Sequence, residues 1–196
     1  MKFNSVATKA LLFAAISLLV LLRSGAPGQE QTFPAYGTGK IEVRLYTDYF
    51  CPPCLKMEPA VEPIVKDLIK RNVIRLTLVD VPFNRQSILY TRYFLYALKG
   101  KNNPEHAIKV RNILFETAGA GNVTTQEQLE KHLKINGILF QPFDLKSAFD
   151  RFNALIREDH IDATPTCVII KSGKKKIFSG GEDIVLHRRR RRDRRR

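Results

Sequence analysis

The residues of this 196-residue chain that could do chemistry are two cysteines in the segment Cys51-Pro52-Pro53-Cys54. Alternating apolar residues precede the segment and apolar residues at helical spacing follow it, so the thiols should lie at the start of a helix. Unpaired backbone N–H groups and the positive end of the helix dipole at that point favour a thiolate over a thiol. Because a thiolate attacks disulfides, the segment predicts thiol–disulfide exchange.

The same pair of cysteines permits other interpretations. It could form a structural disulfide, or it could contribute to a copper or zinc site. Two thiolates need further ligands to close a zinc site, and the four histidines show no paired spacing. Pro52 and Pro53 have no N–H to offer a sulfur, so other groups must stabilise the thiolate. The direction of the exchange is left open.

Simple periodicities predict the elements that position this segment. Residues 41–45 alternate between apolar and polar and predict a strand. Residues 61–69 have an apolar face at helical spacing, and Pro59 should kink that helix. Residues 74–78 alternate again, and a strand–helix–strand order implies a parallel pair of strands.

The next region, about 86–160, is expected to be an all-helical insertion. Its expected helices cover residues 87–98, residues from the Asn103-Pro104 cap towards Thr117, a segment opened by a capping box of Thr124 and Glu127, and residues 145–157. The pattern of residues predicts two further β-strands, at residues 166–170 and 176–178. A turn at Ser172-Gly173 should join these two strands into a hairpin.

Three short segments together suggest a known family. They are Asp48-Tyr49-Phe50-Cys51-Pro52-Pro53-Cys54, Pro59 in the following helix, and Ala163-Thr164-Pro165-Thr166 before the late hairpin. In this order of elements the chain resembles the thioredoxin superfamily, and within it the DsbA-like exported thiol–disulfide oxidoreductases. The resemblance covers roughly residues 40–181. It implies an α/β fold, a thioredoxin-like fold with an all-helical insertion between the second strand and the C-terminal β-hairpin.

The resemblance also implies roles for four residues. Cys51 corresponds to the exposed nucleophile and Cys54 to the buried resolving thiol, and the two form the redox-active disulfide. Thr164 and Pro165 correspond to the substrate-binding loop, in which the peptide bond before the proline is cis. The implied partners are substrate proteins with thiols or disulfides and a redox partner that resets the dithiol. No cofactor and no metal are expected. The alternatives are a reductase or isomerase of periplasmic disulfides, or a metal-handling or redox-inert binding module on the same fold.

Other residues have less specific interpretations. Cys167 is expected to be a small buried core residue, the alternative being a third redox thiol. Asp48 could accept a proton near the dithiol or could simply cap the end of its strand. Glu58, His160 and His187 are interpreted as ordinary surface residues. Apolar residues are few from 182 to 186, so the last helix is expected to be very short, missing or atypical, which would leave one face of the sheet under-covered.

The N-terminal residues 1–28 have the order of a secretory signal peptide. Lys2 and Lys9 precede an apolar run over residues 10–22, and small residues follow it. The run is short for a membrane span, although an uncleaved N-terminal anchor remains an alternative. Export predicts a periplasmic or extracellular location, where disulfides persist. Residues 29–187 are then the thioredoxin-like domain.

Residues 188–196 contain eight Arg and one Asp and account for half of the formal net charge of +14. A block of like charges repels itself, and this segment is expected to be a disordered, solvated tail. A weak contact of the Arg tail with an anionic membrane surface is the alternative. No nucleic-acid partner is expected for an exported protein.

Overall fold

The structure is a computed structural model that describes residues 32–184. The predicted signal peptide, His187 and the Arg-rich tail lie outside the described residues, so the predictions about them stay predictions. Between residues 32 and 184 no helix is both long enough and apolar enough to cross a membrane.

Five strands form one mixed sheet in the spatial order β1-β3-β2-β4-β5. They are β1 (Ala35–Tyr36), β2 (Ile41–Thr47), β3 (Ile74–Asp80), β4 (Thr166–Lys171) and β5 (Lys174–Ser179). The central strand β2 is parallel to β3 and antiparallel to β4, which forms the hairpin with β5. The predicted parallel pair and the predicted hairpin are therefore confirmed. The short strand β1 was not predicted, because two residues are too few to show an alternation.

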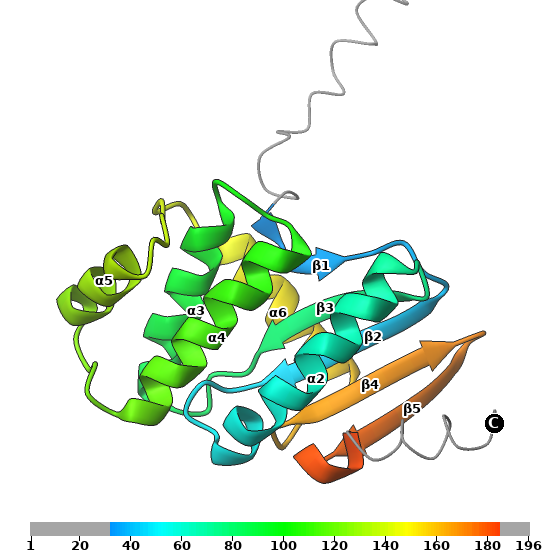
Figure 1. Cartoon of the computed structure of the whole chain (residues 1–196). Helices are drawn as coiled ribbons and strands as arrows, with labels where there is room; N and C mark the ends of the chain where they lie inside the picture. Colours follow the sequence, from blue (N-terminus) through cyan, green and yellow to red (C-terminus); the bar gives the residue numbers. More distant parts are fainter. Residues whose placement is uncertain (1–31, 185–196) are drawn as a thin grey trace, which may run out of the picture. The chain divides into compact units, whose positions relative to one another are not determined.

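Helices make up the rest of the domain (Figure 1). They are α2 (Pro52–Lys70), α3 (Arg85–Leu98), α4 (Pro104–Ala120), α5 (Gln126–Ile135) and α6 (Lys146–Glu158). The last four lie between β3 and β4 and confirm the predicted helical insertion. Pro59 and Pro63 both lie inside α2, which continues to Lys70. The kink at Pro59 stays a prediction.

The predicted start of α5 was wrong by one residue. Thr125, and not Thr124, is the N-cap, and its partner in the capping box is Gln128 rather than Glu127. The physical reason is that the side-chain oxygen of Gln128 accepts hydrogen bonds from the backbone N–H groups of both threonines, at 2.9 and 3.1 Å. With Thr125 as the N-cap, more of the free backbone N–H groups at the start of α5 have an acceptor.

The two faces of the sheet are covered by different helices. Alternate residues of β2 point in opposite directions, so Thr47 meets Arg111 of α4 on one face. On the other face, the Tyr46 hydroxyl donates to the carboxylate of Asp159, the residue that caps the end of α6, at 2.5 Å. Helices α2 and α4 lie in front of the sheet and α6 behind it (Figure 1).

The C-terminal part of the sheet has less cover. Residues 181–184 form a single helical turn, and the residues that would extend it lie outside the described part of the chain. Strand β5 is largely exposed, and Ile177 keeps 50 % of its surface accessible. Because this turn reaches the last described residue, the expectation of a very short or atypical last helix stays a prediction.

Candidate active site

Cys51 occupies the N-cap position of α2. Its backbone is extended, and its Sγ atom accepts a hydrogen bond from the N–H of Cys54 at 3.3 Å. Pro52 and Pro53 fill the first two helical positions, where a missing N–H costs little. The first N–H that this helix can offer to the sulfur is therefore that of Cys54. This donor answers the question, raised by the two prolines, of which group supports negative charge on Cys51 Sγ.

Cys54 differs from Cys51 in its exposure to solvent. Its side chain is fully buried, whereas Cys51 is partly exposed. The two Sγ atoms lie 2.7 Å apart, and both thiols are free. Burial raises the pKa of the Cys54 thiol far above its ordinary value, and the contact with Cys51 raises this pKa further. The pair therefore consists of an accessible sulfur and a buried, protonated one.

The loop before β4 packs against the accessible sulfur. The Thr164–Pro165 peptide bond is cis, as expected. The thiol of Cys51 donates to the carbonyl oxygen of Thr164 at 3.2 Å. Pro165 is buried, and its carbonyl accepts the N–H of Gly180 at 2.9 Å. The structure thus brings all four residues singled out from the sequence into one place.

Asp48 lies just before Cys51 in the sequence and accepts several hydrogen bonds. It is buried, and its Oδ1 atom accepts from the N–H of Phe50 at 2.7 Å and from the hydroxyl of Ser87 at 2.6 Å. Its Oδ2 atom accepts from the N–H groups of Phe83 and Asn84, at 2.8 and 3.2 Å. A carboxylate that holds four donors fixes the backbone around Cys51, which agrees with the capping interpretation of Asp48.

A buried ionic cluster lies one helical turn beyond Cys54. The guanidinium of Arg111, a residue only 1 % exposed, contacts Glu58 of α2 at 2.5 Å and Asp80 of β3 at 3.0 Å. It also donates to the Thr47 hydroxyl at 2.8 Å. The interpretation of Glu58 as a surface residue was wrong, because the ion pair with Arg111 compensates the charge that burial would otherwise penalise.

The cluster holds two carboxylates for one cation. The second oxygen of Asp80 and the buried hydroxyls of Tyr49 and Thr91 make no hydrogen bond of normal geometry among the described residues, although both hydroxyls act on the Asp80 carboxyl and lower its pKa. Burial raises the pKa of Asp80 from 3.8 to about 6, against the opposing effect of Arg111. Sequence reasoning missed Arg111 and Asp80. The only available signal was a charged residue on the apolar face of its helix, which a single sequence does not distinguish from a surface residue.

The remaining predicted residues have simpler positions. Cys167 is buried on β4, directly opposite Leu45 on β2, and burial raises the pKa of its thiol to about 12. It is therefore a core residue, as expected. His160 is exposed after the end of α6. Within residues 32–184 no three His, Cys, Asp or Glu side chains are grouped in a way that could hold a metal ion.

The fold and the cysteine pair together define a class of protein. It is a thioredoxin-like domain with a dithiol at a helix N-terminus, beside a cis-proline loop. The family model described as thioredoxin matches residues 34–177, which is more than half of the chain. The chain belongs to the thioredoxin family.

Individual curated relatives are described as DsbA proteins. The chain is similar to the thiol:disulfide interchange protein DsbA of Bordetella parapertussis, with 27 % identity over 143 residues. The match covers 69 % of this chain and 66 % of that protein, so it spans just under two thirds of the relative's length.

Two solved structures share the fold. Wolbachia pipientis alpha-DsbA1 has a TM-score of 0.63 at 13 % identity, over 83 % of this chain and 89 % of that one. A periplasmic thioredoxin-like protein from Salmonella enterica serovar Typhimurium has a TM-score of 0.60 at 18 % identity, over 85 % and 95 % of the two chains. The predicted DsbA-like thioredoxin fold is thereby confirmed.

Proposed function

We propose that this protein is an exported thiol–disulfide oxidoreductase that exchanges disulfides with substrate proteins through Cys51 and Cys54. One observation carries the proposal. The partly exposed Cys51 sulfur lies 2.7 Å from the buried Cys54 sulfur and 3.2 Å from the Thr164 carbonyl in the cis-proline loop. The similarity to proteins named for thiol:disulfide interchange supports the same activity.

The proposed reaction has two steps that balance in sulfur and electrons. The Cys51 thiolate attacks one sulfur of a substrate disulfide, which forms a mixed disulfide and releases the other substrate sulfur as a thiolate. Cys54 then loses its proton and attacks Cys51 Sγ, which releases the second substrate thiolate and leaves a Cys51–Cys54 disulfide. In the opposite direction the protein donates its disulfide to two substrate thiols. A redox partner must then restore the starting state.

The loop of Thr164 and Pro165 is proposed to hold the substrate. In the dithiol form the Cys51 thiol donates a hydrogen bond to the Thr164 carbonyl. When Cys51 becomes a thiolate or enters a disulfide it can no longer donate, so the carbonyl becomes free to accept an N–H from a substrate strand. The burial of Pro165 keeps this carbonyl beside the sulfur.

The proposed location is outside the cytoplasm, in the periplasm or the extracellular space. The basic, apolar and small-residue segments of residues 1–28 support export. The Salmonella structural neighbour is itself described as periplasmic. An oxidising compartment would allow the Cys51–Cys54 disulfide to persist.

The test compares cysteine variants in the reduction of insulin and in the oxidation of a dithiol peptide. Cys51→Ser should lose both activities, and Cys54→Ser should accumulate a mixed disulfide with the substrate. Cys167→Ser is the matched control and should stay active. Full activity of Cys51→Ser would exclude the proposal. Equilibration of the wild type with glutathione then gives the direction, because each 30 mV corresponds to about 1.4 kcal/mol.

A further inference from the structure

Exposed lysines gather at the end of the sheet opposite the dithiol. We define the lysine end as Lys40, Lys70, Lys171, Lys174 and Lys176, all of them exposed. Lys40 directly precedes β2, Lys70 closes α2, and the other three belong to the β4–β5 hairpin.

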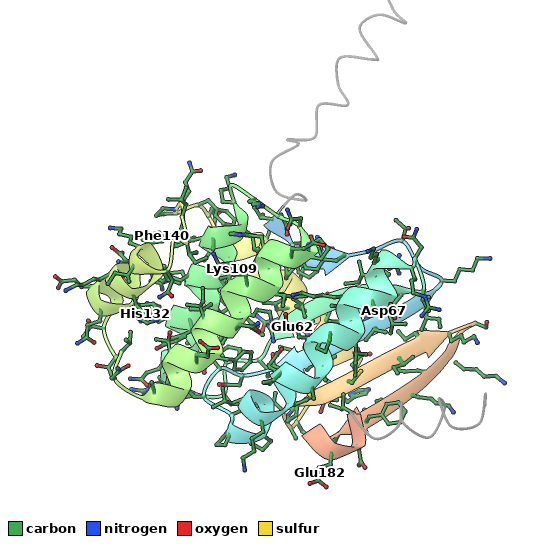
Figure 2. All side chains as sticks on the ribbon, in the orientation of Figure 1. Glu62, Asp67, Lys109, His132, Phe140 and Glu182 are labelled. Atoms are coloured by element: carbon green, nitrogen blue, oxygen red, sulfur yellow. The ribbon has the colours of Figure 1, made fainter. Side chains whose placement is uncertain are left out.

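Strand register places these residues close together. Ile41 at the start of β2 pairs with Ile74 at the start of β3, and Glu42 pairs with Ile170 near the end of β4. The N–H of Val73 bonds back to Leu68 in the last turn of α2. The hairpin tip, the start of β2 and the end of α2 therefore lie at one end of the domain (Figure 1). Figure 2 shows Glu182 at the other end of β5, near the start of α2.

The charge at the lysine end is not compensated within the described part of the chain. Neighbouring cations do have partners there, since Arg71 pairs with Asp67 and Arg75 with Glu42. The five lysines have no ion pair among residues 32–184. Lys171 and Lys174 are direct cross-strand partners. Like charges at such positions destabilise a hairpin, so this arrangement has a cost that an external anionic partner would offset.

We propose that the lysine end is a docking surface for an anionic phospholipid membrane. Clustered lysines beside a bilayer each contribute about 1 kcal/mol of attraction to anionic headgroups. The half-exposed Ile177 directly follows Lys176 on β5 and offers apolar contact with the interface. Because the lysines and Cys51 lie at opposite ends, a bound molecule presents its dithiol to the aqueous side.

The test uses the exported, processed protein and vesicles made of equal parts phosphatidylglycerol and phosphatidylcholine. To separate the domain from the tail, the tail arginines are replaced by glutamine in every protein compared. The Lys171→Gln/Lys174→Gln/Lys176→Gln variant should lose about a hundredfold in partitioning, because about 1 kcal/mol per lysine corresponds to about fivefold each. Insulin reduction should be unchanged, which shows that the variant is folded.

The matched control removes the same charge elsewhere. Lys101→Gln/Lys109→Gln/Lys131→Gln changes three exposed lysines of the helical insertion and should retain most of the binding. Equal losses in the two triple variants would mean attraction by net charge alone and would overturn the proposal. So would equal binding to pure phosphatidylcholine vesicles, or binding to heparin without binding to the mixed vesicles.

Discussion

The Sγ atom of Cys51 lies 3.2 Å from the carbonyl oxygen of Thr164, across 113 positions of sequence. This contact joins the first turn of α2 to the loop that opens β4. The proposed nucleophile and the proposed substrate-binding carbonyl are thus hydrogen-bond partners in the dithiol form. A substrate strand that binds this carbonyl must replace the Cys51 thiol as its donor.

Alkylation should distinguish the three thiols of the reduced protein. Burial raises the pKa of both Cys54 and Cys167, so these two stay protonated and shielded at neutral pH. Iodoacetamide should therefore label only Cys51 in the native protein. Mass spectrometry of tryptic peptides measures the labelling, and protein unfolded in urea, in which all three cysteines react, is the control. Native labelling of Cys167 at the rate of Cys51 would contradict this prediction.

Replacing Pro53 should make the protein more oxidising. An N-cap side chain accepts from the second or third helical N–H, and Pro53 occupies the second position. Pro53→Ala adds a donor there, and a hydrogen bond to a charged acceptor contributes about 1.5 kcal/mol. The equilibrium with glutathione should then shift by about tenfold towards the reduced protein, which is about 30 mV.

Pro52→Ala is the matched control for that change. It adds an N–H at the first helical position, which does not reach the N-cap side chain. Its equilibrium with glutathione should stay close to that of the wild type. Equal shifts in the two variants would mean that greater helix flexibility, and not the new donor, changes the potential.

Removing the buried cation should destabilise the fold strongly. Arg111→Leu leaves Glu58 and Asp80 buried without their counter-ion, and the loss of one partner from a buried pair costs about 3–5 kcal/mol. Urea unfolding measures the change in the free energy of unfolding. Adding Glu58→Gln and Asp80→Asn to Arg111→Leu should restore part of the stability. A loss of unfolding free energy below about 1 kcal/mol is typical of an exposed ion pair. Such a result would contradict the assignment of Arg111 to a buried ionic cluster.

The ionisation of Asp80 should make the stability of the folded protein depend on pH. Its pKa is about 6 in the folded state against an ordinary value of 3.8, so the folded state binds this proton more tightly. The stability that Asp80 contributes is therefore fully present below about pH 3.8 and is lost as the pH rises through about 6.

The variant Asp80→Asn isolates this effect. The stability of the wild type relative to the variant should fall by up to about 3 kcal/mol between pH 4 and pH 7. Urea unfolding at a series of pH values measures the difference, from which the contributions of carboxylates outside the Arg111 cluster cancel. A difference that is flat with pH, or that rises with it, would exclude the assignment.

Much of the framework could be predicted from local patterns. The alternation of Ile41, Val43 and Leu45 predicted β2, and Asn103 predicted the start of α4, because these signals depend on neighbouring residues alone. The placement of Cys51 at a helix start followed from the same kind of pattern. The position of Thr164 and Pro165 beside it came from the resemblance and not from periodicity.

What could not be predicted depends on distant partners. Glu58 is separated from Arg111 by 53 positions of sequence, and each residue alone is typical of a helix surface. Strand β1 has two residues and exists because Ala35 and Tyr36 pair with Thr77 and Leu76 of β3. Tertiary pairing decides both features, and a single sequence does not display it.

Asp48 has a consequence for protein engineering. Its two oxygens hold the backbone just before Cys51 and the loop that carries the 59 % exposed Phe83. A graft or insertion between Val81 and Asn84 would therefore displace Cys51 along with the loop. Substitutions at Phe83 are therefore best made by exchanging side chains at constant loop length.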